Sequence, residues 1–177
     1  MNPLPVRAAK IQSPLLRPDT LSRPRLNGWL DRAARGRLVL VVGDAGFGKT
    51  TLLADWAGET SRRTAWYGLE HDDRDWLTLV RHLVAGGREA DPGFAPDTYA
   101  MLCALGIGGP TQEELTGALA REMAAFGAAD AQGFSLILDD YHAIEGSEET
   151  DPVIARLLEA TGQGFSIVIA TRSAPEL

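Results

Sequence analysis

Apolar positions along the chain fall into short continuous runs and into helical spacings, and together they predict a repeated strand–helix order. The runs, bounded by glycine or polar residues, are typical of strands buried on both faces of a parallel sheet. Between them, apolar residues recur every three or four positions, which predicts amphipathic helices. We expect strands at 37–42, 64–69, 134–139 and 165–171, and helices at 26–34, 50–58, 75–85, 111–126 and 152–160. This order predicts an α/β fold, a three-layer αβα sandwich with a mainly parallel sheet.

Two stretches lack such a pattern. Prolines throughout residues 1–25 deny that stretch a continuous helix, because each lacks a backbone donor and restricts its neighbour, so we expect an extended N-terminal arm. Residues 86–110 are rich in glycine and proline and are expected to form loop and short helix. Residues 26–177 are expected to form one domain that is truncated at its C-terminal end, since the chain stops just beyond an apolar strand.

Polar residues mark where several helices begin. Thr111, with Glu114 three residues later, predicts a capping box at the start of the fourth helix. Asp151 is expected to cap the fifth helix. Asp72 and Asp73 shortly precede the third helix, so helix capping is the first explanation for them.

Composition adds two constraints. Hydrophobic residues make up 45% of the chain and charged residues 23%, which is ordinary for a soluble folded domain. We find neither an apolar run near the ~20 residues that span a bilayer nor a signal-peptide pattern, so we expect a cytoplasmic protein without membrane contact. The net charge is −7, yet residues 1–37 carry eight basic and two acidic side chains. A basic arm can contact nucleic acid; solvated charge or nucleotide contact is the alternative we favour, because no recognition helix or stacking platform is evident.

The segment after the first expected strand matches a phosphate-binding P-loop in both spacing and context. Gly43 is followed by four residues and then by Gly48, Lys49 and Thr50, at the start of a helix. Glycines at Gly43, Gly46 and Gly48 would let main-chain N–H groups surround phosphates, and the helix start adds partial positive charge. Lys49 would neutralise the β- and γ-phosphates, and the Thr50 hydroxyl would ligate Mg²⁺. The expected nucleotide-binding residues of the loop are Gly43, Asp44, Ala45, Gly46, Phe47, Gly48, Lys49, Thr50 and Thr51.

Two carboxylates end the expected strand at 134–139. The carboxyl ends of parallel strands face the ligand crevice, so Asp139 would hold Mg²⁺ and Asp140 would orient or deprotonate a water. Such a pair can also simply begin a turn. Arg172 follows the last strand, where it would sense a γ-phosphate or merely be solvated. The three histidines show no ligand spacing, so we expect no metal site beyond the nucleotide's Mg²⁺.

The motifs together resemble the nucleotide-binding domain of the large ATP-binding LuxR-type (maltose-regulon-activator-like) transcription regulators, in the STAND class of P-loop NTPases. The resemblance rests on residues 13–26, on VVGDAGFGKTTLLADWA at 41–57, on AWYGL at 65–69, on LILDDYHAI at 136–144 and on IATRSAPEL at 169–177. It implies that ADP holds a closed resting form, that ATP with an inducer permits self-association, and that hydrolysis resets the switch.

The resemblance also bears on individual residues. It implies that Arg23 lies in the segment that packs near adenine, that Arg172 is the sensor, and that Asp139 and Asp140 form the acidic pair. Such regulators continue into a further strand, a winged-helix module, a repeat array and a C-terminal helix-turn-helix, which we do not find in this sequence. We therefore expect no direct DNA binding by this segment.

Three functional hypotheses follow. The first is an ATP- and ADP-binding switch domain with slow Mg²⁺-dependent hydrolysis. The second is a non-hydrolysing nucleotide-binding interaction module or an incomplete regulator fragment. The third, a small phosphotransferase, would need an acceptor pocket and lid arginines after the acidic strand end, and the sequence indicates neither.

Overall fold

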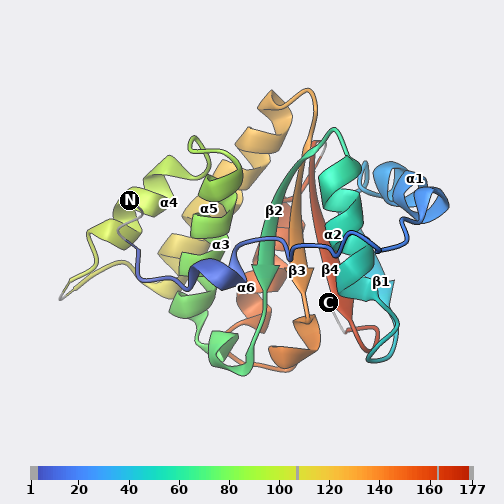
Figure 1. The fold of residues 1–177 in the computed structure, drawn as a ribbon. Coiled ribbons are helices and arrows are strands. Elements are labelled where there is room, and N and C mark those ends of the chain that lie inside the picture. Colours follow the sequence, from blue (N-terminus) through green and yellow to red (C-terminus); the bar gives the residue numbers. More distant parts are fainter. Residues whose placement is uncertain (1–3, 107, 163, 176–177) are drawn as a thin grey trace.

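Four parallel strands form the centre of the molecule, in the spatial order β1–β4–β3–β2 (Figure 1). The computed structural model describes residues 4–106, 108–162 and 164–175. The strands are β1 (Leu38–Val42), β2 (Arg63–Gly68), β3 (Phe134–Asp139) and β4 (Phe165–Thr171). The α-helices are α1 (Pro24–Ala33), α2 (Lys49–Glu59), α3 (Trp76–Ala90), α4 (Pro96–Cys103), α5 (Gln112–Ala129) and α6 (Asp151–Ala160). Short 3₁₀ turns are η1 (Ala8–Lys10), η2 (His71–Arg74) and η3 (Tyr141–Ala143).

Helices cover both faces of this sheet, which confirms the expected three-layer α/β fold. Helices α1 and α2 lie on one face, and α3, α5 and α6 lie on the other (Figure 1). Alternating side chains along a strand divide it between the two layers. In β3, Leu136 and Leu138 belong to the larger core and Ile137 to the smaller one. Burying each such side chain stabilises the fold by about 1.5–3 kcal/mol, so the two central strands hold their carboxyl ends firmly in place.

The first strand departs from the expectation of burial on both faces. Within the described residues β1 pairs only with β4 and forms one edge of the sheet. Val39 is buried, Leu40 is partly buried, and Val42 is 49% exposed. An unbroken apolar run therefore indicated a strand correctly but not its place in the sheet, because edge and central strands can share the same composition.

The glycine- and proline-rich stretch at 86–110 contains more helix than its composition indicates. Helix α3 continues through Gly86 to Ala90, and α4 follows. A Cβ atom at Gly86 would lie 2.9 Å from the carbonyl oxygen of Trp66 in β2. Glycine is therefore needed there so that α3 can approach the sheet, rather than to end the helix.

Helix caps follow the sequence at one helix and depart from it at another. The capping box at the start of α5 is confirmed: Thr111 accepts from the main chain of Glu114, whose side chain accepts in turn from the Thr111 main chain. The expected Asp151 cap is wrong. Helix α6 begins at Asp151 itself, after Thr150, which makes no side-chain cap bond. Pro152 suits the first turn, so the helix starts earlier and the Asp151 charge lies at its positive end.

The N-terminal arm crosses the molecule from the α3 side to α1 (blue in Figure 1). Its described part contains the turn η1 and otherwise no helix before α1 begins at Pro24. Residues 12–19 are exposed along the way. Residues 1–3 of the expected arm and residues 176–177 of the expected domain, which end the IATRSAPEL motif, lie outside the described residues.

Candidate functional site

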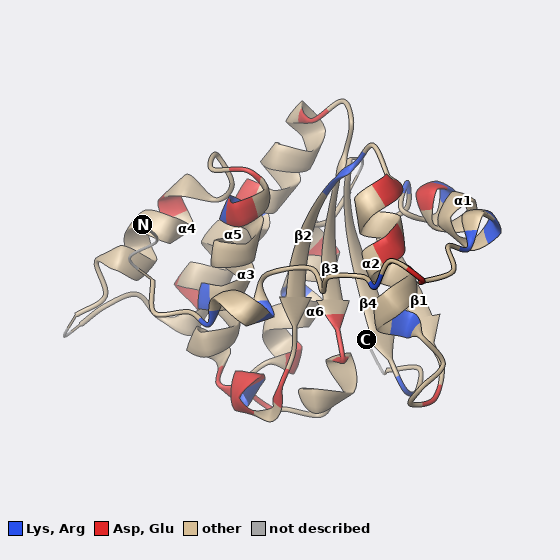
Figure 2. Cartoon of the chain, viewed as in Figure 1, with Lys and Arg blue, Asp and Glu red and all other residues tan. Residues whose placement is uncertain are grey.

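The carboxyl ends of the four strands meet at one edge of the sheet, and the loop between β1 and α2 lies at this edge (Figure 1). Residue pairing fixes the arrangement: Val42 is opposite Thr171, and Asp139 is opposite Gly68. Figure 2 shows a basic segment at the start of α2 and an acidic one after β3 at this same edge. Candidate residues that are far apart in the sequence are therefore brought together here by the sheet.

The loop backbone bends where the motif has its second and third glycines. Gly46 and Gly48 have φ values of 84° and 77°, in the left-handed region that strains other residues. Gly43 differs from our expectation, because its φ is not positive and a Cβ atom there would make an ordinary 3.6 Å contact with Phe47. Asp44, Ala45 and Phe47 complete the loop and are exposed.

Positive charge concentrates where this loop enters α2. Lys49 donates from Nζ to the carbonyl oxygens of Gly43, at 2.6 Å, and Asp44, at 3.1 Å, which places its ammonium against the loop. The first turn of α2, which includes Thr50 and Thr51, contains no acidic residue that would offset the helix dipole. The first N–H groups of a helix have no partner within that helix, and together with a lysine they make a site for an anion.

The two carboxylates after β3 have different environments. Asp139 is only 4% exposed, whereas Asp140 is exposed and has a φ of 57°. Burial raises the pKa of Asp139, and the Asp140 charge adds to this, while a hydrogen bond with the Thr50 side chain opposes it. The contact with Thr50 joins the strand end to the start of α2. The sequence alone predicted that these two elements approach each other.

Buried oxygen atoms that lack hydrogen-bond partners show whether the site fits a Mg²⁺ ion. Among the described residues, Asp139 Oδ1 and Thr171 Oγ1 are buried and have no hydrogen-bond partner. Carboxylate and hydroxyl oxygens are hard donors of the kind that Mg²⁺ prefers. The unpaired Oδ1 of Asp139, a carboxylate that also contacts the Thr50 side chain, therefore fits a Mg²⁺ ion held together with phosphate oxygens.

Two arginines lie at the border of this site. Arg172 is exposed and directly follows Thr171, whose carbonyl oxygen accepts from the Gly43 main chain at 3.2 Å. Arg23 precedes α1, and its Nη2 would lie 3.7 Å from a Cβ atom built on Gly48. The Arg23 guanidinium thus lies beside the loop from the α1 side.

Sequence reasoning assigned the wrong role to Asp73. Asp75, not Asp72 or Asp73, caps α3 by accepting from the Thr78 main chain at 2.7 Å. Asp73 is fully buried and accepts from the Glu70 main chain at 2.7 Å. Asp73 therefore helps to cap the 3₁₀ turn η2 rather than α3. Its carboxylate has a second hydrogen-bond partner, which comes from a distant part of the chain.

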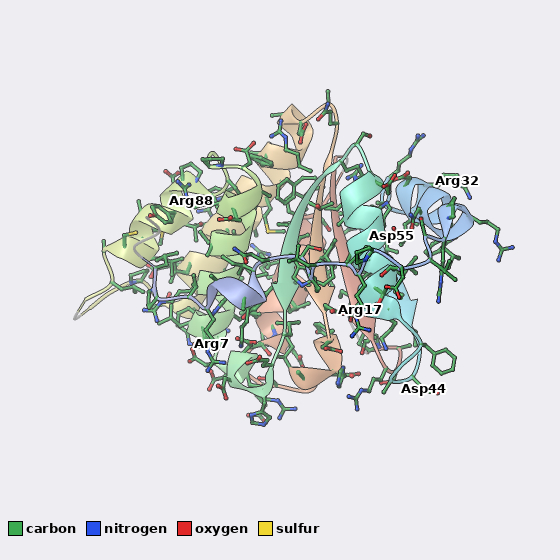
Figure 3. All side chains as sticks on the ribbon, in the orientation of Figure 1. Arg7, Arg17, Arg32, Asp44, Asp55 and Arg88 are labelled. Atoms are coloured by element: carbon green, nitrogen blue, oxygen red, sulfur yellow. The ribbon has the colours of Figure 1, made fainter. Side chains whose placement is uncertain are left out.

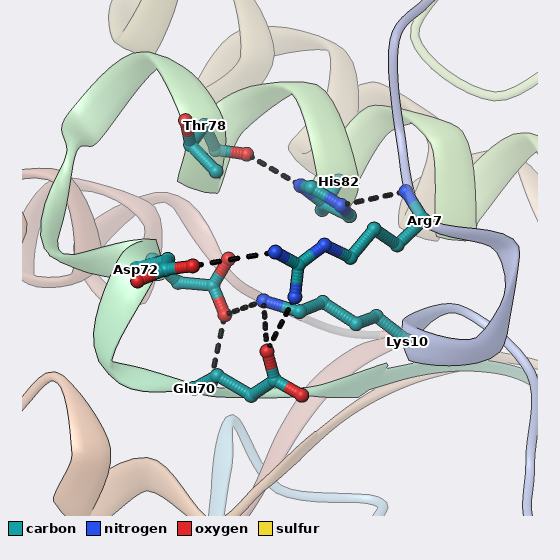
Figure 4. Close-up of polar contacts among 7 residues, drawn as sticks. Arg7, Lys10, Glu70, Asp72, Thr78 and His82 are labelled. Atoms are coloured by element: carbon teal, nitrogen blue, oxygen red, sulfur yellow. Dashed lines mark hydrogen bonds and ion pairs between the residues drawn. The ribbon is translucent and has the colours of Figure 1, made fainter.

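That partner is Lys10 of the N-terminal arm (Figure 4). Lys10 Nζ lies 2.7 Å from Asp73 Oδ2 and 3.1 Å from Glu70 Oε2, and its side chain is only 6% exposed. Nearby, the Arg7 main chain donates to His82 Nε2 at 3.1 Å. These contacts fasten the arm to the β2 side of the sheet. The sequence offered one signal for the role of Lys10, which is that the chain has only two lysines, Lys10 and Lys49 of the loop.

A second missed residue is Asp55 on α2. Its Oδ2 accepts from the side chains of Ser22 and Asn27, each at 2.8 Å, and from the Arg23 main chain at 3.4 Å. No local pattern signals this role, because Asp55 is a half-buried helical residue whose partners lie far away along the chain.

Comparison with known proteins places this geometry in a family context. The family model described as AAA ATPase domain matches residues 23–169. The HTH-type transcriptional regulator MalT of Cronobacter sakazakii is 30% identical over 174 residues, which covers 96% of this chain and 18% of that protein. This similarity confirms the resemblance inferred from the motifs, and the chain spans less than a fifth of that curated relative.

Two further findings complete the comparison. A solved structure of C. elegans PCH-2 aligns with 84% of this chain and 35% of its own, at 12% identity and a TM-score of 0.37. Among the helices of the described residues, none has both the length and the apolar character that crossing a membrane requires.

Proposed function

The chain belongs to the AAA ATPase domain family, and we propose that it is the ATP- and ADP-binding switch domain of a bacterial transcription regulator, with slow Mg²⁺-dependent hydrolysis. The observation that carries this proposal is the contact between the Thr50 side chain, at the start of the phosphate loop's helix, and Asp139, at the end of a buried strand. A phosphate loop alone would support nucleotide binding. The adjacent buried carboxylate adds a place for the metal ion.

Each element of the site has a defined part in this proposal. Main-chain N–H groups of the loop and of the first turn of α2, at Gly46, Gly48, Lys49, Thr50 and Thr51, would surround the phosphates, and Lys49 would balance the charge of the β- and γ-phosphates. Thr50 and Asp139 would hold Mg²⁺, and the ion would neutralise charge on the phosphates. Asp140 would orient the attacking water and accept one of its protons. The bond from the water oxygen to the γ-phosphorus forms as the bond from that phosphorus to the β–γ bridging oxygen breaks, which yields ADP and phosphate. Arg172 senses the γ-phosphate.

The regulatory part of the proposal rests on the resemblance to MalT-type regulators. ADP would hold a resting form and ATP would permit self-association in the cytoplasm. We assign no DNA binding to this segment. Arg23, beside Gly48, would help to hold the nucleotide near the start of α1.

Isothermal titration calorimetry of the purified chain with ADP and ATP, each with and without Mg²⁺, tests the binding claim. We expect one site per chain and tighter ATP binding when Mg²⁺ is present. Absence of binding to both nucleotides would contradict the proposal.

A non-hydrolysing nucleotide-binding module is the second candidate. The exposure of Asp140 and Arg172 favours it, because groups that act on a γ-phosphate are usually shielded from bulk water. Phosphate release measured under saturating Mg²⁺-ATP separates the two candidates: binding without turnover would support the second.

A further inference from the structure

Three hydrogen bonds converge on one carboxylate oxygen of α2, at the point where the arm meets α1. Asp55 Oδ2 accepts from the Asn27 and Ser22 side chains and from the Arg23 main chain. Figure 3 shows Asp55 on α2 beside the arm. These bonds, the one from Asn27 foremost, hold the pKa of Asp55 below its ordinary value. Asp55 is therefore a charged anchor for the segment from Ser22 to Asn27.

This anchor matters because of what precedes it in the chain. Residues 12–19 are exposed. Arg23, at the N-cap of α1, makes no side-chain cap bond that would fix the start of the helix. Asp55 therefore provides contacts that fix the main chain at Arg23. Its own helix is also the helix that begins with the phosphate loop's Lys49 and Thr50.

The anchored residue points back to that loop. Arg23 Nη2 would lie 3.7 Å from a Cβ atom on Gly48, the loop's last glycine. An arginine has many rotamers, and holding its guanidinium in one place costs side-chain entropy. Fixing its main chain removes further freedom, so a guanidinium that starts from an anchored backbone stays near the loop more of the time.

We propose that Asp55 is a positioning residue for nucleotide binding: by tying Ser22, Arg23 and Asn27 to α2, it keeps the Arg23 guanidinium beside the phosphate loop. This inference rests on the proposed nucleotide binding. The proposed anchoring and simple electrostatics predict opposite changes in nucleotide affinity when the Asp55 charge is removed. Removing a negative charge near a polyphosphate site should strengthen anion binding, whereas removing an anchor of Arg23 weakens it.

The test is the affinity of the full chain for Mg²⁺-ADP, measured by calorimetry on Asp55→Ala. Alanine is a good helix former, so α2 is retained. The loss of charge-assisted positioning should weaken binding about five- to tenfold. Asp55→Asn keeps one acceptor oxygen and should lose less. The matched control is Glu59→Ala, which removes an exposed carboxylate at the end of the same helix and should not weaken binding. Unchanged or tighter binding by Asp55→Ala overturns the proposal.

A double-mutant cycle with Arg23→Ala asks whether Asp55 acts through the arginine. On that background Asp55→Ala should weaken binding by less than about twofold, because the group it positions is gone. If Asp55→Ala weakened binding by the same factor in the wild-type and Arg23→Ala proteins, the proposal would be overturned.

Hydrogen exchange of residues 22–27 in ligand-free protein tests the anchor itself. It should be faster in Asp55→Ala than in wild type, and equal exchange rates would also overturn the proposal. Wild-type protein that fails to bind Mg²⁺-ADP would contradict the proposed function instead, and the exchange comparison would still decide whether Asp55 holds the arm.

Discussion

Replacing Lys10 with methionine should strongly destabilise the domain, because it leaves the fully buried Asp73 carboxylate without its cation. The two groups lie 2.7 Å apart, with the lysine 6% and the aspartate 0% exposed. At this distance and an effective dielectric constant of ~20, their attraction is about 6 kcal/mol. Much of it offsets the cost of removing both charges from water, so the intact pair contributes little net stability. Removing only the lysine leaves the aspartate charge buried without a partner, and such a change typically lowers the free energy of unfolding by about 3–5 kcal/mol.

The assay is urea unfolding followed by the fluorescence of the buried Trp56 and Trp66. The free energy of unfolding of a domain of this kind is about 5–15 kcal/mol, so the expected loss of stability should lower the urea midpoint by a readily measured amount. Arg7→Met is the matched control. Arg7 contacts Glu70 and Asp72 from the same arm but is 62% exposed, so its loss should cost at most about 1 kcal/mol.

A double substitution, Lys10→Met with Asp73→Asn, removes both charges and should restore part of the stability lost in Lys10→Met. The reasoning would be refuted if Lys10→Met unfolded within about 1 kcal/mol of wild type, or if the two substitutions simply added. Either result would mean that the Lys10–Asp73 contact is not a desolvated ion pair that fastens the arm.

Two further predictions concern turnover and pH. Asp140→Asn should leave Mg²⁺-ATP affinity within about twofold and suppress phosphate release, because Asp140 is assigned to the water rather than to the phosphates; equal loss of binding and turnover would show the acidic pair to be misassigned. Burial lowers the pKa of His82 below its ordinary value of about 6.5, against the opposing effect of Asp73. The unfolded state therefore binds the proton first, and stability that is fully present above about pH 6.5 should be lost as the pH falls. His82→Gln should flatten this dependence in unfolding experiments at pH 5 to 8, and an unchanged slope would exclude His82 as its source.

The strands and the main features of the candidate site could be predicted from sequence because their signals are local. The run Phe134–Asp139 is apolar, ends in an acid and proved to be a buried strand. The glycine spacing placed a loop with two left-handed residues after β1. Parallel order alone then brought both elements to one edge, since all strands of a parallel sheet point the same way.

What the sequence could not indicate depends on partners that are distant along the chain. Lys10 and Asp73 are separated by 63 positions, and neither has a periodic pattern that marks it as buried. Asp55 looks like any exposed helical acid until Ser22 and Asn27 are placed against it. The edge position of β1 was missed for a related reason: strand order is a property of the assembled sheet.

We expect the phosphate loop to hold a nucleotide whose charge Lys49 balances, and the other functional predictions depend on this binding. The direct measurement is calorimetric titration of Lys49→Ala with Mg²⁺-ADP beside wild type, with circular dichroism to confirm equal folding. Loss of a charged donor to phosphate should weaken binding at least about 100-fold, so that no heat is detected at micromolar protein. Micromolar affinity retained by a folded Lys49→Ala protein would contradict this expectation.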